Sequence, residues 1–242
     1  MRPTRRIDRR SASPRRVTAV VAALLAVTAV TGCGSTRFTP GAAATVNGEA
    51  ISQDRVNAIV SAACAFTAAN AEASGQPPSP VSLANLRASI TQAVVQFALT
   101  DRAAQERDIT VTDAVITEAT AANPVPEELD EKDKAALTGF FEEFGRSNAQ
   151  LRIIGANLAD PSVTTLDEVT EDRSQQASKY LESYTRKQDV TINPAYGEWT
   201  GDTVTGGSGS LSNPVSRVAK ASQTAAASGG ADTANLPASQ VC

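Results

Sequence analysis

The sequence lacks several residue types and motifs that common active sites require. It contains no histidine, so a Ser-His-Asp triad, a Cys-His pair and a His-containing metal site are all impossible. No glycine-rich loop has the spacing that cradles a nucleotide phosphate. Glu142 and Glu143 are neighbouring carboxylates, but adjacent helical residues diverge by about 100° and do not converge on one substrate. The sequence therefore predicts no catalytic residue, no metal site and no cofactor.

Cys33 lies where a lipid anchor would be attached. Residues 1–16 hold seven arginines against one acid, and residues 17–30 carry no charge. This is the pattern of an export signal, and its apolar segment is too short to remain as a spanning helix. Val30-Thr31-Gly32-Cys33 resembles a bacterial lipobox. We expect removal of residues 1–32, lipidation of Cys33 and a location on the extracytoplasmic face of the cell membrane. An ordinary secretory signal with an incidental cysteine is the alternative.

Without its first 32 residues the chain would be acidic. Residues 33–242 keep 15 of the 22 Lys and Arg and 25 of the 26 Asp and Glu, a formal charge of −10. Phosphate contacts need a clustered basic surface, so a nucleic-acid partner is disfavoured. The acidity also argues against a second, electrostatic membrane anchor. The lipid on Cys33 is therefore the expected contact with the membrane.

Apolar residues at helical spacing predict a mainly α fold. A hairpin that turns at Asn47-Gly48 leads into a first helix, which Ser52 caps and which ends near residue 73. Gly145 is expected to end a later helix, and capping boxes at Ser147–Gln150 and Thr165–Glu168 to open the next two. The other predicted elements are helices over residues 81–107, 112–122, 127–144, 149–159 and 165–187 and a strand over residues 190–192.

These elements divide the chain into four parts. Residues 1–32 are the predicted signal peptide, residues 33–44 a tether, residues 45–200 one helical domain and residues 201–242 a tail. Glycine, serine, alanine and threonine dominate the tail, so we expect most of it to be a disordered linker. Its last seven residues regain apolar character, which favours an end that docks on the domain.

Cys64 and Cys242 remain once Cys33 carries lipid. An extracytoplasmic compartment lets a disulfide persist. At 100° per residue Cys64 falls near the edge of the apolar stripe of its helix, where a returning tail can reach it. We predict a Cys64–Cys242 disulfide, which would stabilise the fold by about 4–5 kcal/mol in the chain-entropy model. The alternative is a buried free Cys64 with Cys242 loose or paired to another chain.

Aromatic residues are the candidates for a peptide-binding surface. Phe140, Phe141 and Phe144 are half of the six phenylalanines, and the first two cannot point the same way. Tyr196 and Trp199 follow the predicted late strand. Core packing is the alternative for the three phenylalanines, since aromatic residues at helical spacing usually point inward. The alternative for Tyr196 and Trp199 is that they cover the sheet. The acidic run at residues 127–133 lacks EF-hand spacing and lies at a predicted helix start, so it is interpreted as a solvated face.

Three segments resemble the SurA/PrsA type of extracytoplasmic chaperone. They are VNGEAIS before a helix, DITVTDAVITEA after a long amphipathic helix, and DVTINPAYGEW after the last helix. More narrowly, the chain is similar to the SurA N-terminal-domain lipoproteins of high-GC Gram-positive bacteria. The resemblance covers residues 45–200. It implies a helical chaperone domain in which residues 45–51 pair with residues 190–192.

The resemblance implies a function without catalysis. Many members of the family carry a parvulin prolyl-isomerase domain of about 100 residues. Only a short loop separates residues 159 and 165, and the paired histidines of a parvulin site are absent. The expected function is a lipid-anchored holdase for unfolded or translocated polypeptides. The alternative is a cell-envelope adaptor that holds one specific folded partner, which the low count of ten aromatic residues favours.

Overall fold

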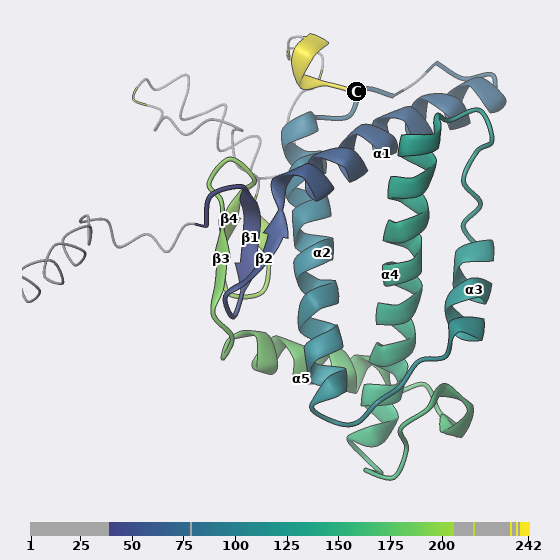
Figure 1. Ribbon diagram of the computed structural model, residues 1–242, viewed down its shortest axis with the longest axis vertical. Coiled ribbons are helices and arrows are strands. Elements are labelled where there is room, and N and C mark those ends of the chain that lie inside the picture. The colour runs from purple at the N-terminus through teal and green to yellow at the C-terminus, as the bar shows by residue number, and fades with distance from the viewer. Residues whose placement is uncertain (1–38, 78, 206–214, 216–232, 234–235, 237) are drawn as a thin grey trace, which may run out of the picture. The chain divides into compact units, whose positions relative to one another are not determined.

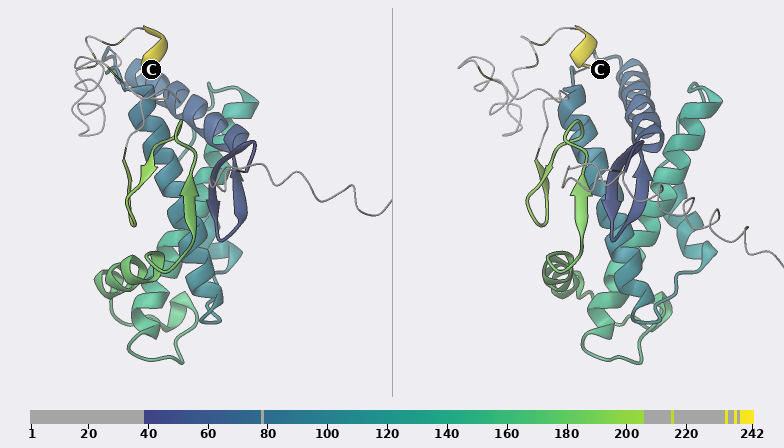
Figure 2. Two further views of the ribbon diagram at one scale, coloured as in Figure 1. Left: turned by 90° about the vertical axis from the view of Figure 1, so that its left-hand side faces the viewer. Right: turned by 60° about the vertical axis from the view of Figure 1, so that its left-hand side comes forward.

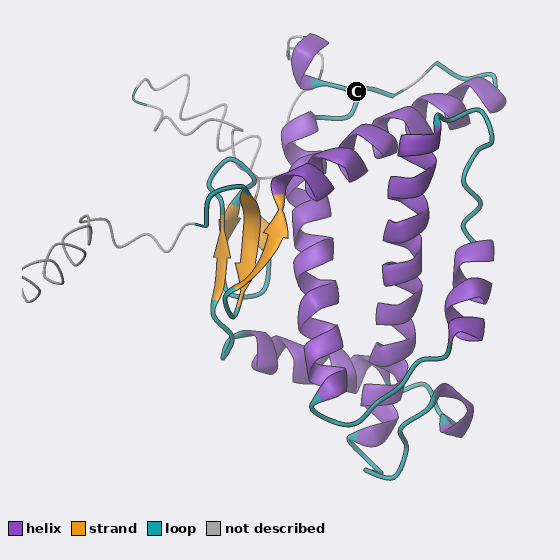
Figure 3. Cartoon of the chain, viewed as in Figure 1, coloured by secondary structure: helices purple, strands orange, loops and turns teal. Residues whose placement is uncertain are grey.

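The computed structural model describes residues 39–77 and 79–205, together with residues 215, 233, 236 and 238–242 (Figure 1). Long helices dominate this part of the chain, and its strands are short (Figure 3). The predicted mainly α fold with a small β element is confirmed.

Helices of nine to 27 residues make up most of the described chain. They are α1 (Gln53–Ala73), α2 (Leu83–Gln105), α3 (Asp113–Ala121), α4 (Glu131–Asn157) and α5 (Ser174–Thr185). Side chains cap three of the starts: Ser52 Oγ accepts the Arg55 N–H at 3.2 Å, Ser82 Oγ accepts the Asn85 N–H at 3.5 Å, and Asp130 Oδ1 accepts the Asp133 N–H at 2.7 Å. Helix α4 packs against the other four, with α2 and α3 on either side of it (Figure 1).

The early hairpin pairs with the late strand, as predicted. Strands β1 (Ala42–Val46), β2 (Glu49–Ser52) and β3 (Val190–Ile192) form an antiparallel sheet in the order β2-β1-β3. Asn47 and Gly48 turn the hairpin with φ of 52° and 86°. The Asn47 side chain accepts the Asp189 N–H at 2.9 Å, which joins the turn to the start of β3. The sheet lies beside α2 on the side away from α4 (Figure 1), and the turned views of Figure 2 bring it to the front.

Strand β1 begins earlier than the predicted boundary between tether and domain. Ala42, Ala43 and Ala44 were expected in the tether, but all three are buried in β1. Three successive alanines show no alternation of apolar and polar residues, so the sequence gives no strand signal there. The folded domain therefore starts at least three residues before residue 45.

A second small sheet lies partly in the region that was expected to be unstructured. Strand β4 (Glu198–Trp199) pairs antiparallel with β5 (Val204–Thr205), beyond residue 201. Val204 is buried in the core, and its N–H donates to Gln92 Oε1 on α2 at 3.3 Å. A two-residue strand is too short to show periodicity. The prediction for this region therefore rested on composition alone and missed the strand. The rest of the predicted disordered linker lies largely outside the described residues.

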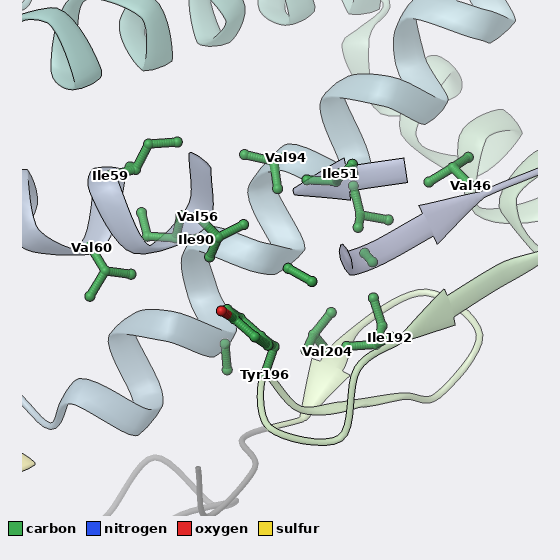
Figure 4. Close-up of a cluster of buried hydrophobic side chains, with 14 of the residues drawn as sticks. Val46, Ile51, Val56, Ile59, Val60, Ile90, Val94, Ile192, Tyr196 and Val204 are labelled. Carbon is green, nitrogen blue, oxygen red and sulfur yellow. The ribbon is translucent and has the colours of Figure 1, made fainter. Parts of the chain in front are cut away.

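Three apolar clusters hold these elements together. The largest joins the hairpin, α1, α2 and the late strands, and Figure 4 shows Tyr196 and Val204 facing Val56 and Ile90 from the helices. The second lies where α2, α4 and α5 meet, around Ile153. The third lies between α1 and the start of α4. All their members lie within residues 43–204, so a chain that starts at residue 34 contains every cluster.

Helix α4 runs through the point where two helices were predicted. The expected C-cap at Gly145 and the expected capping box at Ser147–Gln150 are both wrong, because Gly145 is helical and buried. A Cβ at Gly145 would lie 2.5 Å from the Ala119 Cβ on α3. Glycine here allows a close approach of two helices and does not end one. Gln150 is buried, and its amide donates to Asp101 Oδ1 at 2.8 Å.

The helix predicted over residues 165–187 is divided. The Thr165–Glu168 capping box is present, but it opens only the short 3₁₀ helix η1 (Leu166–Glu168). The chain then leaves helical geometry, and α5 begins at Ser174, whose N–H donates to Asp172 Oδ1 at 2.9 Å. The break lets the Arg173 carbonyl pack against Gly155, where a Cβ would meet that oxygen at 2.3 Å. Tertiary contact with α4 thus outweighs the local helical pattern.

Candidate functional site

A pocket of about 200 Å³ lies between α1, α2 and α4. Its walls come from the first turn of α1 and from the middle of α2 and of α4. The lining residues are Arg55, Val94, Phe97, Ala98, Asp101, Glu143, Arg146, Ser147 and Gln150. Both α2 and α4 contribute residues at i, i+3, i+4 and i+7, which is one helical face each. The pocket therefore forms where these two faces meet beneath the start of α1.

Apolar side chains of α2 form one wall of the pocket. Val94 is buried, and Phe97 and Ala98 are half-buried. The Phe97 ring lies 5.5 Å from the Phe140 ring and 6.4 Å from the Phe144 ring, centroid to centroid. Phe144 is 41% exposed. The apolar surface thus continues from the pocket wall through Phe97 to an exposed aromatic ring on α4.

The three candidate phenylalanines of α4 have different surroundings. Phe140 packs against the largest core cluster, and Phe141 packs against the cluster between α1 and α4. The Phe141 ring is 6.3 Å from the ring of Phe66 on α1. Both side chains are half-buried and join helices to each other. Phe144 is the one whose ring is open to a ligand.

The charged residues that line the pocket differ in what they contact. Arg55 forms an ion pair with Glu143, which ties α1 to α4. Asp101 accepts a hydrogen bond on each carboxylate oxygen, from the Gln150 amide at 2.8 Å and from the Gln105 amide at 2.6 Å. Arg146 is exposed and has no hydrogen bond or ion pair with any described residue. Within the described ranges, the donors of this lining cation are therefore free of protein partners.

Tyr196 and Trp199, the other predicted binding residues, do not line this pocket. Tyr196 is 5% exposed; its hydroxyl donates to Asn57 Oδ1 at 3.1 Å, and the Arg87 guanidinium lies 5.7 Å from its ring centroid. Trp199 is half-buried and packs against the same core cluster. The Tyr196 ring therefore fills the core and presents no exposed face to a ligand.

A second pocket of about 350 Å³ lies between α3, the α3–α4 connection and α4. No aromatic residue is part of its lining. The Thr117 and Thr120 hydroxyls in its wall donate to carbonyls of their own helix, at 2.8 Å each. Their hydrogen-bond donors are therefore already used. This pocket thus presents fewer groups that could bind a polypeptide than the first pocket does.

The described residues also hold few features of other functional classes. In the ranges given above, no three His, Cys, Asp or Glu side chains gather closely enough to hold a metal ion. Over the same ranges, no helix combines the length and the apolar character needed to cross a bilayer.

Comparison with known families identifies the fold. A family model described as a SurA-like N-terminal domain matches residues 6–151, more than half of the 242 residues. The chain belongs to the SurA-like N-terminal domain family. No curated protein and no solved structure matches it.

The family match covers the pocket but not the whole SurA-like domain of this chain. All the lining residues lie between positions 55 and 150, inside the matched segment. The match ends at residue 151 within α4, so α5 and strands β3, β4 and β5 follow it. Strand β3 nevertheless pairs with β1, which makes these later elements part of the same folded unit.

The SurA-like domain carries the predicted disulfide between Cys64 on α1 and Cys242, with their Cα atoms 5.3 Å apart. The short helix η3 (Ala238–Gln240) leads to this bond. The Cys242 N–H donates to the Val81 carbonyl at 2.9 Å, and Val241 pairs with Ser82 in an isolated antiparallel bridge. The last residues therefore dock beside the start of α2, as the apolar end of the tail predicted.

Cys33 and the predicted signal peptide, residues 1–32, lie outside the described residues. Removal of that segment and lipidation of Cys33 stay predictions from the sequence.

Sequence reasoning did not single out Arg55, Phe97, Asp101 or Arg146 as site residues. The sequence did hold one signal. The lining residues of α2 and those of α4 each follow an i, i+3, i+4, i+7 spacing, which places each set on one face of its helix. The spacing does not say which two faces meet, because that depends on packing between elements distant in sequence.

Proposed function

We propose that this SurA-like domain belongs to a non-catalytic chaperone that binds unfolded or translocated polypeptides. The family match is the observation that carries the proposal, since it supports a chaperone-type role with polypeptide substrates. The pocket between α1, α2 and α4 is the suggested contact site. Its apolar wall continues through Phe97 to the exposed ring of Phe144 beside the pocket, and an unfolded chain can cover this surface with its own apolar residues.

Suppression of aggregation tests this proposal. The chain from residue 34 to residue 242 should slow the aggregation of a reduced client protein at micromolar concentration. Phe144→Ser should weaken that effect, because it removes the most exposed aromatic ring beside the pocket. Leu158→Ser is the matched control, since Leu158 is similarly exposed at 37% but lies at the far end of α4. A wild-type chain that neither slows aggregation nor crosslinks to unfolded peptides would contradict the function.

The proposal includes a lipid anchor at Cys33 and a place on the extracytoplasmic face of the membrane of a high-GC Gram-positive bacterium. The arginine-rich residues 1–16, the uncharged residues 17–30 and the lipobox-like Val30-Thr31-Gly32-Cys33 support it. Cys33→Ser should release the protein from the membrane or leave it unprocessed. A variant that stays in the membrane fraction at its mature size would overturn the anchor.

A specific observation also favours an adaptor that holds one folded partner. Among the described residues, the large apolar side chains that are exposed are Phe144, Leu158 and Val215. Promiscuous binding of unfolded chains needs more apolar surface than isolated side chains offer. Affinity capture from membranes separates the two functions: one stoichiometric partner supports the adaptor, and a spread of clients supports the chaperone.

A further inference from the structure

We propose that the pocket between α1, α2 and α4 selects polypeptide segments in which a large apolar residue stands beside an acidic one. This inference rests on the proposed function and names the class of segment that the site binds. The apolar wall would take the large side chain, and Arg146 would take the carboxylate of its acidic neighbour.

The size of the pocket fits one side chain. Its volume of about 200 Å³ is smaller than the ~300–1,000 Å³ of typical small-molecule sites. Val94, Phe97 and Ala98 give the wall an apolar surface against which a leucine or phenylalanine side chain can pack. Since Phe97 also contacts exposed Phe144, a bound segment can extend along α4 beyond the pocket.

The charged residues of the pocket determine which kind of residue the bound segment carries beside its large apolar residue. The Glu143 carboxylate is already neutralised by Arg55, and both Asp101 oxygens already accept side-chain amides. A basic ligand group would have to share these two carboxylates with the protein groups that already bind them. Arg146 has no partner in the described part of the chain, so a carboxylate can bind its guanidinium without displacing anything. A guanidinium also offers paired donors that match the two oxygens of a carboxylate.

The preference for an acidic residue arises only at close range, from the contact of its carboxylate with Arg146. The chain from residue 33 onward carries a formal charge of −10, so its long-range field does not attract an acidic segment. A contact between Arg146 and a carboxylate would therefore lengthen the lifetime of the complex more than it would speed association. The preference should appear in the dissociation rate.

Binding of matched fluorescent peptides to residues 34–242 tests the inference. The peptides are acetylated and amidated, so that no terminal carboxylate takes part, and they differ only in a glutamate, glutamine or lysine beside one leucine. The glutamate peptide should bind about fivefold tighter than the glutamine peptide, the magnitude of a partly exposed ion pair. Arg146→Gln should abolish the preference, and Arg146→Glu should shift it toward lysine. Arg152→Gln, an exposed arginine of α4 outside the pocket lining, should leave it unchanged.

The outcomes separate the inference from the function on which it rests. Equal binding of the three peptides, or a glutamate preference that survives Arg146→Gln, would overturn the selection and leave the chaperone function standing. A wild-type chain that binds no peptide and fails to slow aggregation would overturn both. Arg146 is exposed and lies within a helix, so its variants should keep the wild-type circular dichroism spectrum and thermal midpoint.

Discussion

Glycines of helix α4 show how a single hydrogen atom in place of a methyl group controls packing. Gly155 lies against the Arg173 carbonyl, where an added Cβ would meet the oxygen at 2.3 Å. Gly145 faces the Ala119 methyl on α3. Gly139, in the same helix, has nothing within 4 Å of a Cβ. Glycine lowers the helix propensity equally at all three positions. A close tertiary contact that compensates for this loss is present only at Gly145 and Gly155.

We predict opposite effects of the same substitution at two of these positions. Gly155→Ala should destabilise the domain by about 1–3 kcal/mol, because the backbone of residue 173 must move away from α4. Gly139→Ala should stabilise it by about 0.5–1 kcal/mol through helix propensity alone. Urea denaturation of both variants measures the difference. Equal stabilities would show that the approach of residue 173 to α4 is not tight.

At the scale of elements, the connection between α4 and α5 is organised by carboxylates that accept backbone hydrogen bonds. Glu168 Oε2 accepts the N–H groups of Thr164 and Thr165 at 2.8 and 3.0 Å, and these bonds lower the pKa of Glu168. Hydrogen bonds from Ser162 and Ser174 lower the pKa of Asp160 and Asp172 in the same way. These hydrogen bonds therefore favour the ionised form of all three acids.

The hydrogen bonds of Glu168 should make part of the stability pH-dependent. Because its pKa is lowered in the folded state, its contribution is present above the ordinary glutamate pKa of about 4.3 and is lost as pH falls through the folded value. The wild type should thus be more stable than Glu168→Gln at pH 7, and the gap should close on acidification below about pH 4. Chemical denaturation across this pH range measures the gap.

Glu118→Gln is the control for this titration, because Glu118 is exposed on α3. It should match the wild type at every pH. A gap between wild type and Glu168→Gln that stays constant as the pH falls would contradict the role of the Glu168 carboxylate.

The sequence predicts the elements of this fold better than their ends. Ser52 and the Asn47-Gly48 turn locate the hairpin and α1 correctly, because local backbone chemistry decides both. Gly145 was misread, since a helical glycine that permits close packing looks like a C-cap until its neighbour Ala119 is known. The same limit applies to the pocket. Phe144 was a candidate because it is aromatic, but Arg146 can be recognised as a lining residue only once the packing of α2 against α4 is known.

At the scale of the whole molecule, one covalent bond and one strand pair connect distant parts of the sequence. The pairing of β1 with β3 brings the start of the domain to residues 190–192. The disulfide joins positions 178 residues apart and holds the last residues against α1. Closing so long a loop removes much of the conformational freedom of the unfolded chain.

Removing the disulfide should lower the stability of residues 34–242. We expect Cys64→Ser/Cys242→Ser to lose about 4–5 kcal/mol of unfolding free energy, and reduction of the wild type to cause the same loss. A reductant should not change the stability of the double variant. Peptide mapping under non-reducing conditions checks the bond itself, and two free thiols, or Cys242 joined to another chain, would contradict it.

The same bond gives the polypeptide the covalent topology of a lariat. Its ring runs from Cys64 to Cys242, and its stem contains Cys33, the predicted point of lipid attachment. A protease that hydrolyses one peptide bond inside the ring opens it without dividing the molecule, because the disulfide still joins both pieces. Two cuts within the ring, or one such cut together with reduction, are needed to free a piece of the ring, whereas a single cut in the stem divides the molecule. If Cys33 carries the predicted lipid, a chain tethered by its stem would therefore survive single nicks across most of its length without shedding any part of itself.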